Sequence, residues 1–266
     1  SRSAMTDRRR RQKEQRAAKL EAEKKQEARK ELGRRLGTAL VFGVVVVGIV
    51  VAGAYFGSDE GELPQGYADF REQPTACGAE QPEPEPVLSF GAPEPQTDVT
   101  AESTVIVTLE TSCGDIVIEL DPAGYPVTTN SFVFLVREGF FDGQVFHRIV
   151  QDFRVFSGDP EANGSGGPGY RIADEFPADD FALAPGMVMM DNVGRGTTGS
   201  QFFVLTGEAA SALNPQFNLL GEVVSGEVTL EAIAGVETAV RPGSTEQSLP
   251  LETVYIERAT VDVTDS

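Results

Sequence analysis

The sequence predicts a mainly β domain, built as a closed antiparallel barrel with two capping helices, behind a single transmembrane helix and a Pro-rich tether. From about Thr104 onward, short alternating or β-branched runs are separated by Gly-rich connections, a pattern typical of β-barrels. Two short segments within that region carry helical signals. One uncharged run, residues 36–56, precedes it.

The composition of the 266-residue chain lies in the globular range, with 40% hydrophobic and 24% charged residues. These values exclude a wholly disordered chain and a polytopic membrane protein. One His and two Cys exclude a His-rich metal site and a dense disulfide framework. Residues 1–56 hold 14 Lys+Arg and 6 Asp+Glu, whereas residues 57–266 hold 8 Arg, no Lys and 35 Asp+Glu. A basic head and an acidic body indicate two different environments.

The uncharged run 36–56, LGTALVFGVVVVGIVVAGAYF, is 21 residues long. A bilayer core requires about 20 apolar residues in a helix, so we expect a transmembrane anchor here. The Lys/Arg excess belongs on the cytoplasmic side, which predicts a single-pass protein of the cell membrane with a cytoplasmic N-terminus and an extracytoplasmic C-terminal domain. A cleaved signal peptide is the alternative, because Ala52-Gly53-Ala54 resembles a cleavage site, but the head and the run are long for one.

The regions on either side of the anchor differ in composition. Residues 1–35 are rich in helix formers and predict a basic juxtamembrane helix, which either only determines the topology or also binds anionic lipid headgroups. Residues 57–99 hold seven of the sixteen prolines and mostly acidic charge, as expected for an extended linker. Residues 100–266 then form the folded domain.

The folded domain opens with two predicted strands, TVIVTLE and DIVIEL, joined as a hairpin around Thr111–Gly114. Pro126 begins a predicted helix that Gly139 ends, with Phe132 and Leu135 on its core face. Short strands follow, then a second helix in VTLEAIAGV and a closing strand in ETVYIERATVDV.

Several familiar types of site are not supported by the spacing. His147 has no Cys or His partner for zinc, and a serine triad would require Ser157 or Ser200 to lie beside it. The Gly-rich run 163–170 lacks the Lys of a P-loop, and the acidic pairs that follow it lack EF-hand spacing. We therefore expect a structural His147, an exposed Gly-rich loop and an acidic surface, with no metal.

The domain also carries five motifs in a fixed order. They are VFHRIVQDF at 145–153, NGSGG at 163–167, DEF at 174–176, MMDNVGRGTTGSQFFVLTG at 189–207 and FNLLGEVVSG at 217–226. In order and spacing they resemble the cyclophilin family of peptidyl-prolyl isomerases, over about residues 104–264. The combination of F-H-R, G-S-Q-F-F and a late G-x-V-x-x-G is specific. The anchor and tether are similar to those of exported actinobacterial members.

The resemblance implies a shallow groove on an eight-stranded barrel. Arg148 matches the catalytic arginine of the family. Asn192 would pair with the substrate through its backbone, and Gln201 would orient the peptide by side-chain hydrogen bonding. Four further residues match the positions that line the pocket for the proline ring: Phe153, Phe203, Leu213 and Phe217.

Several residues depart from the family pattern, among them Ala212 at the apparent position of a tryptophan found in some members. Phe156 stands where a glutamine that hydrogen-bonds the catalytic arginine is usual, and Arg154 replaces an apolar pocket residue. Asp191 occupies a small-residue position near the adjoining pocket, and Phe217 stands where a histidine is common.

Phe156 leaves two arrangements of Arg148 open. If the ring faces the groove, Arg148 lacks a side-chain acceptor, and Arg154 adds like-charge repulsion unless Asp191 pairs with it. We then expect Phe156→Gln to raise turnover. If the ring instead packs over Arg148 and positions it by stacking, as planar guanidinium groups permit, the same substitution would lower turnover.

The expected chemistry needs no cofactor. Rotation about an X-Pro bond meets a barrier of about 18–20 kcal/mol from amide resonance, and a guanidinium that donates to the prolyl nitrogen stabilises the twisted state. We expect an isomerase that assists folding of exported proteins, with Pro-containing exported polypeptides as substrates, membrane lipid around the anchor and no nucleic-acid partner. The alternative is a catalytically weak module that binds Pro-containing segments. Arg148 favours the enzyme, whereas Phe156 and Arg154 favour the binder.

Cys77 and Cys113 both lie on the predicted exported side, where disulfides persist. We expect a bond between them that ties the end of the linker to the first hairpin. Two free thiols are the alternative.

Overall fold

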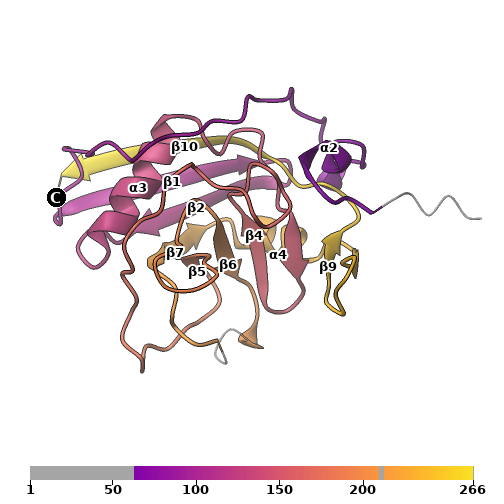
Figure 1. Cartoon of the computed structure of the whole chain (residues 1–266). Coiled ribbons are helices and arrows are strands. Elements are labelled where there is room, and N and C mark those ends of the chain that lie inside the picture. The colour runs from indigo at the N-terminus through magenta and orange to yellow at the C-terminus, as the bar shows by residue number, and fades with distance from the viewer. Residues whose placement is uncertain (1–62, 210–212, 266) are drawn as a thin grey trace, which may run out of the picture. The chain divides into compact units, whose positions relative to one another are not determined.

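The computed structural model describes residues 63–209 and 213–265. In this part the chain folds around an eight-stranded sheet with the order β10-β1-β2-β7-β5-β6-β4-β3, and a two-stranded sheet pairs β8 with β9. Figure 1 shows helix α3 crossing in front of the long strands β1, β2 and β10. The predicted mainly β architecture with two principal helices is confirmed.

The strands and helices have the following bounds. The strands are β1 (Ser103–Thr111), β2 (Gly114–Leu120), β3 (Arg148–Val150), β4 (Arg154–Ser157), β5 (Met187–Met190), β6 (Phe202–Leu205), β7 (Leu219–Ser225), β8 (Thr238–Val240), β9 (Gln247–Pro250) and β10 (Ile256–Asp265). The helices are α2 (Tyr67–Phe70), the 3₁₀ turn η1 (Ala76–Gly78), α3 (Pro126–Arg137) and α4 (Glu227–Ala234).

The prediction of a closed barrel is wrong, because the edge strands β3 and β10 do not pair with each other. β3 has only three residues, which pair with β4, and β10 pairs along its length with β1. The segment before β3 meets only the start of β10, through a bridge between Val145 and Tyr255 and backbone hydrogen bonds between residues 143–146 and 254–256. The sheet therefore curves around the core, but no continuous ladder closes it.

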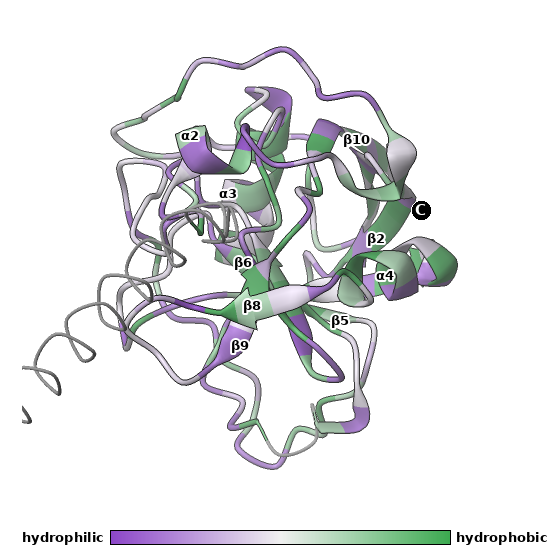
Figure 2. Ribbon diagram, turned by 90° about the vertical axis from the view of Figure 1, so that its right-hand side faces the viewer, coloured by the Kyte–Doolittle hydropathy of each residue, from purple (hydrophilic) through white to green (hydrophobic). Residues whose placement is uncertain are grey.

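Helix α3 forms as the sequence predicts. Pro126 occupies the first turn, and Gly139 lies just beyond the end with φ of 69°, a conformation that glycine adopts without strain. The helix is buried on almost every side, however, and not only on a core face, since Phe132, Phe134 and Leu135 are at most 4% exposed. Something must therefore cover its outer surface. Helix α4 is amphipathic by contrast, with alternating hydrophilic and hydrophobic colours in Figure 2 and only Leu230 and Ile233 buried.

A strap formed by residues 63–99 covers the outer surface of the domain. The segment that we expected to be an extended linker is packed here, because it carries a few large apolar residues among its prolines. Phe70 is fully buried beside Val145 and Tyr255. The ring of Phe90 meets that of Phe134 at 5.0 Å in an edge-to-face contact, so the strap covers the outer side of α3.

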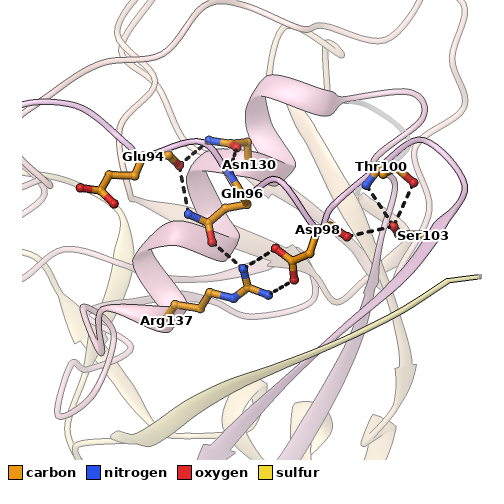
Figure 3. A network of polar contacts seen from close by, with 7 residues as sticks. All are labelled: Glu94, Gln96, Asp98, Thr100, Ser103, Asn130 and Arg137. Carbon is orange, nitrogen blue, oxygen red and sulfur yellow. Dashed lines mark hydrogen bonds and ion pairs between the residues drawn. The ribbon is translucent and has the colours of Figure 1, made fainter.

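Polar contacts hold the end of the strap against α3 (Figure 3). Arg137 donates to both carboxylate oxygens of Asp98, at 2.8 and 2.6 Å, and also to the side-chain oxygen of Gln96. The backbone N–H of Gln96 donates to Asn130 of the same helix. The fork of Arg137 lowers the pKa of Asp98 to about 2. The pair therefore contributes to stability above the ordinary carboxyl pKa, and its contribution is lost as the pH falls toward 2.

The predicted head, residues 1–35, and the predicted anchor, residues 36–56, lie outside the described residues. Among residues 63–209 and 213–265, no helix has the length and apolar character to cross a membrane.

The structure joins Cys77 and Cys113 by a disulfide across a separation of 36 residues, as predicted. It ties the strap to the turn between β1 and β2. We expect the Cys77→Ser/Cys113→Ser variant to lose about 3–4 kcal/mol of free energy of unfolding, because closing such a loop restricts the unfolded chain. Urea unfolding with and without reductant measures the loss. The free energy of unfolding of the parent should fall on reduction, and that of the variant should not. An intact mass of the parent that does not change on reduction would contradict the bond.

Candidate active site

The candidate site is built on one face of five neighbouring strands. Opposite residues on antiparallel strands project to the same face. The pairs Arg148–Phe156, Phe156–Phe203, Phe203–Met189 and Met189–Leu219 therefore form one row across β3, β4, β6, β5 and β7.

The neighbouring row projects to the opposite face and fills the main core. It contains Ile149, Val155, Val204 and Val188. The site row instead builds a second hydrophobic cluster with Phe156, Phe203, Met189 and Leu219. Strand alternation thus separates the candidate site from the core.

Arg148, the predicted catalytic residue, is held by two contacts. Its Nε donates to Oε1 of Glu246 at 2.8 Å, and its Nη2 donates to Oε2 at 2.7 Å. Its guanidinium carbon lies 4.4 Å from the ring centroid of Phe156. Of the two arrangements that the sequence left open, the structure shows the second, with Phe156 stacked on Arg148. Glu246 also supplies a side-chain acceptor, so Arg148 does not lack one.

Glu246 lies in the turn that connects β8 with β9, and sequence reasoning missed it. The turn is closed by a bond from the N–H of Arg241 to the carbonyl of Glu246 at 3.0 Å. Hydrogen bonding from Arg148 lowers the pKa of Glu246 to about 2, so the pair is charged near neutral pH. Glu246 is 98 residues from Arg148 in the sequence, and nothing in its local pattern distinguishes it from the many other acidic residues.

Arg154 lies within an aromatic box formed by Phe153, Phe156, Phe203 and Phe217. Its guanidinium carbon is 4.7, 4.7, 4.8 and 5.9 Å from these ring centroids, in that order. Burial, and then the charge of Arg148, lower the pKa of Arg154.

The pairing of Asp191 with Arg154 that we considered is not formed. Within the described part of the chain, Arg154 has no ion pair, and its buried Nε and Nη1 atoms have no hydrogen-bond partner. Burial raises the pKa of Asp191. The positive charge of Arg154 lowers this pKa, but by less than burial raises it.

The structure brings the predicted pocket residues together. The rings of Phe203 and Phe217 meet at 5.1 Å edge to face. Leu213 packs against the same cluster, and Phe153 contacts Arg154. The three phenylalanines among the four residues assigned from the resemblance thus surround one position, which the guanidinium of Arg154 occupies.

Asn192 and Gln201 line a neighbouring pocket of about 220 Å³. Nδ2 of Asn192 donates to the carbonyl of Gln216, and Nε2 of Gln201 donates to the carbonyl of Gly166, which positions both side chains. The Gly-rich run, which we expected to be an exposed loop, forms one wall of this pocket. Asp191 and Arg171 also line it, and sequence reasoning did not single out Arg171.

The alternative chemistries are not assembled around His147. This side chain is 2% exposed, and burial lowers its pKa to about 3, so it is neutral. The hydroxyls of Ser157 and Ser200 donate to backbone carbonyls instead. In the described segments, no group of three His, Cys, Asp or Glu side chains is arranged to hold a metal ion.

The fold and the motifs together define a proline isomerase class, and comparisons with known proteins identify the family. Residues 106–261 match the family model described as cyclophilin type peptidyl-prolyl cis-trans isomerase/CLD. The chain belongs to this family and is a peptidyl-prolyl cis-trans isomerase.

Individual relatives agree with this assignment. Peptidyl-prolyl cis-trans isomerase B of Streptomyces anulatus is 38% identical over 170 residues, covering 58% of this chain and 95% of the relative. Peptidyl-prolyl cis-trans isomerase A of Mycobacterium tuberculosis is 35% identical over 174 residues, covering 60% and 93%. A Cryptosporidium parvum cyclophilin-type isomerase solved in the presence of the dipeptide Ala-Pro has a TM-score of 0.53 at 24% identity, covering 59% of this chain and 98% of that one, which shows the shared fold.

The first prediction from this geometry concerns Phe156. Because its ring stacks on Arg148, we expect Phe156→Gln to lower kcat/KM on a short proline peptide about tenfold, equivalent to about 1.4 kcal/mol. Phe156→Leu separates loss of stacking from burial of a polar amide and should also be less active than the parent. Proline-peptide kinetics measure both variants. A rise in kcat/KM for Phe156→Gln would mean that the ring obstructs the site.

The second prediction concerns Glu246 as a positioning residue. We expect Glu246→Ala to lower kcat about tenfold with little change in KM, because a misaligned donor weakens interactions made in the transition state. Glu246→Gln, which keeps one acceptor oxygen, should recover part of the loss. Glu252→Ala removes an exposed carboxylate of the same C-terminal region and should behave as the parent. Full activity of Glu246→Ala would show that Arg148 is positioned without this contact.

Proposed function

We propose that this isomerase assists the folding of exported proteins and is held at the membrane by residues 36–56 with the domain outside. The disulfide between Cys77 and Cys113 carries this proposal, because such bonds persist mainly in oxidising, exported compartments. The basic head and acidic body support the same orientation. Secretion delivers unfolded chains in which X-Pro isomerisation is a slow step, so they are suitable substrates.

In the proposed mechanism, Arg148 donates a hydrogen bond to the prolyl nitrogen as the X-Pro bond twists. The lone pair of that nitrogen is then no longer delocalised into the carbonyl, so donation stabilises the twisted state more than the planar one. Glu246 engages Nε and Nη2 of Arg148 and leaves the Nη1 amino group outside the pair. No covalent bond breaks and no group is transferred.

The aromatic box would anchor the prolyl ring while the carbonyl before it rotates. Phe203 and Phe217 form an edge-to-face wall, and apolar rings bury the pyrrolidine favourably. Asn192 and Gln201 lie at the adjoining pocket, where they would hold the chain that precedes the proline. The substrate would thus be fixed on both sides of the rotating bond.

A weak Pro-binding module is the second candidate, because Arg154 occupies the box. A protease-coupled proline peptide assay on the full chain in detergent separates the two functions. An isomerase should lose most of its activity on Arg148→Ala and little on Arg258→Ala, an exposed arginine of β10. A parent that is no faster than Arg148→Ala would favour the binder.

The predicted location is tested in intact cells. We expect protease added to bacterial protoplasts to remove a C-terminal epitope from the full chain and to spare an N-terminal epitope. Both epitopes should stay with the membranes after alkaline extraction and be digested after detergent lysis. A protected C-terminal epitope would contradict the orientation, and a released C-terminal fragment would indicate a cleaved signal peptide.

A further inference from the structure

Arg154 stands where the proline ring is expected to bind. Its guanidinium carbon is within 4.8 Å of the ring centroids of Phe153, Phe156 and Phe203. Planar contact at these distances leaves no room for a pyrrolidine ring between them. A prolyl ring can therefore enter the box only if the guanidinium moves out of it.

The charge of Arg154 is not neutralised by a close partner. Arginine stays charged in proteins, and two of its nitrogen atoms are buried without an acceptor in the described structure. Arg148 stacks on the same Phe156 ring, but only Arg148 forms hydrogen bonds with Glu246, whose charge reaches Arg154 without direct contact. Asp191 acts on Arg154 only through its more distant charge.

Unpaired buried donors favour a ligand that brings its own acceptor. A carboxylate matches the planar fork of a guanidinium with two parallel hydrogen bonds, and such charge-assisted bonds are stronger than neutral ones. A substrate with this group would compensate Arg154 for the ring contacts that it loses on leaving the box. An uncharged substrate would not.

We propose that Arg154 is a specificity-determining residue that makes this isomerase prefer proline segments with Asp or Glu next to the proline. The proposal rests on the assignment of the box as the proline pocket in the proposed function. The guanidinium of Arg154 leaves the box by rotation of its own flexible side chain, with the backbone of β4 fixed in the sheet. Since consecutive Cα atoms are 3.8 Å apart, a residue that flanks the proline brings its carboxylate nearest to a guanidinium displaced from the box.

The experiment measures isomerisation of matched peptides by two-dimensional NMR exchange, which needs no coupling protease. The peptides carry Glu, Gln or Lys before the proline, and a second set carries the same residues after it. The full chain in detergent is compared with Arg154→Met, Arg154→Lys and Arg258→Met. Arg258 is an exposed arginine of β10, so its variant matches the loss of charge outside the site.

We expect the parent to favour the Glu peptide over the Gln peptide by about fivefold in kcat/KM at one of the two positions. Arg154→Met should bring the ratio to about one and raise kcat/KM on the Gln peptide, because the box is then open. Arg154→Lys should retain part of the Glu preference, and Arg258→Met should match the parent. The Glu/Gln ratio of the parent should also fall as salt is added.

A parent ratio near one at both positions, or a ratio that Arg154→Met leaves unchanged, would overturn the proposal. If turnover is too low to measure, the same ratio in peptide Kd decides it, since the selected pairing is present in the bound state. If the box is not the proline pocket, Arg154→Met should leave kcat/KM on the Gln peptide unchanged. A rise on that peptide with a parent Glu/Gln ratio near one would instead contradict only the acidic preference, so the two failures are distinguishable.

Discussion

The candidate site depends on the two-residue alternation of side chains across β3, β4, β6, β5 and β7. One row from these strands packs into the main core, and the next row builds the site. A slip of one residue between β3 and β4 would turn Arg148 into the core and bring Ile149 to the site. The register is stable against such a slip because every residue of the core row is a β-branched aliphatic and fully buried. The core therefore holds the site in place, although the two share no side chain.

The pair between Arg148 and Glu246 has consequences beyond Arg148 itself. In place of an amide acceptor on the neighbouring strand, this chain uses a carboxylate from a distant turn, and Phe156 is released to form a wall of the aromatic box. The carboxylate pairs with Arg148 through two hydrogen bonds and holds its guanidinium in one orientation. Glu246 makes its two hydrogen bonds to guanidinium groups with Arg148, and Arg154 forms no ion pair in the described part of the chain. The charge that remains uncompensated at the site therefore belongs to Arg154 and not to the predicted catalytic arginine.

The parts of the site that could be predicted are those carried by contiguous motifs. Phe153, Phe203 and Phe217 lie in segments whose order and spacing determine the strands, so their convergence follows from the resemblance. Glu246 could not be predicted in this way, because a turn between two short strands places it and its local sequence resembles other acidic turns. The packing of the strap was missed for a different reason. Its average composition indicated a linker, whereas Phe70 and Phe90 provide enough apolar surface for it to pack. The closed barrel was predicted wrongly because the number of strands does not reveal how short an edge strand is, and β3 is too short to pair with β10.

The net charge of the chain determines at what range an acidic preference can operate. Residues 57–266 carry 8 Arg against 35 Asp+Glu, so the domain as a whole repels an acidic polypeptide. At physiological ionic strength this repulsion is screened beyond about 8 Å. Arg154, by contrast, acts from a partly desolvated position among aromatic rings, where a charge pair is screened less. A high overall acidity of the substrate therefore does not strengthen its binding. Only a carboxylate that an adjacent proline brings to Arg154 is attracted by the charge of that arginine. The acidic domain would therefore repel acidic chains at long range, while Arg154 would select at short range those proline segments that carry an adjacent carboxylate.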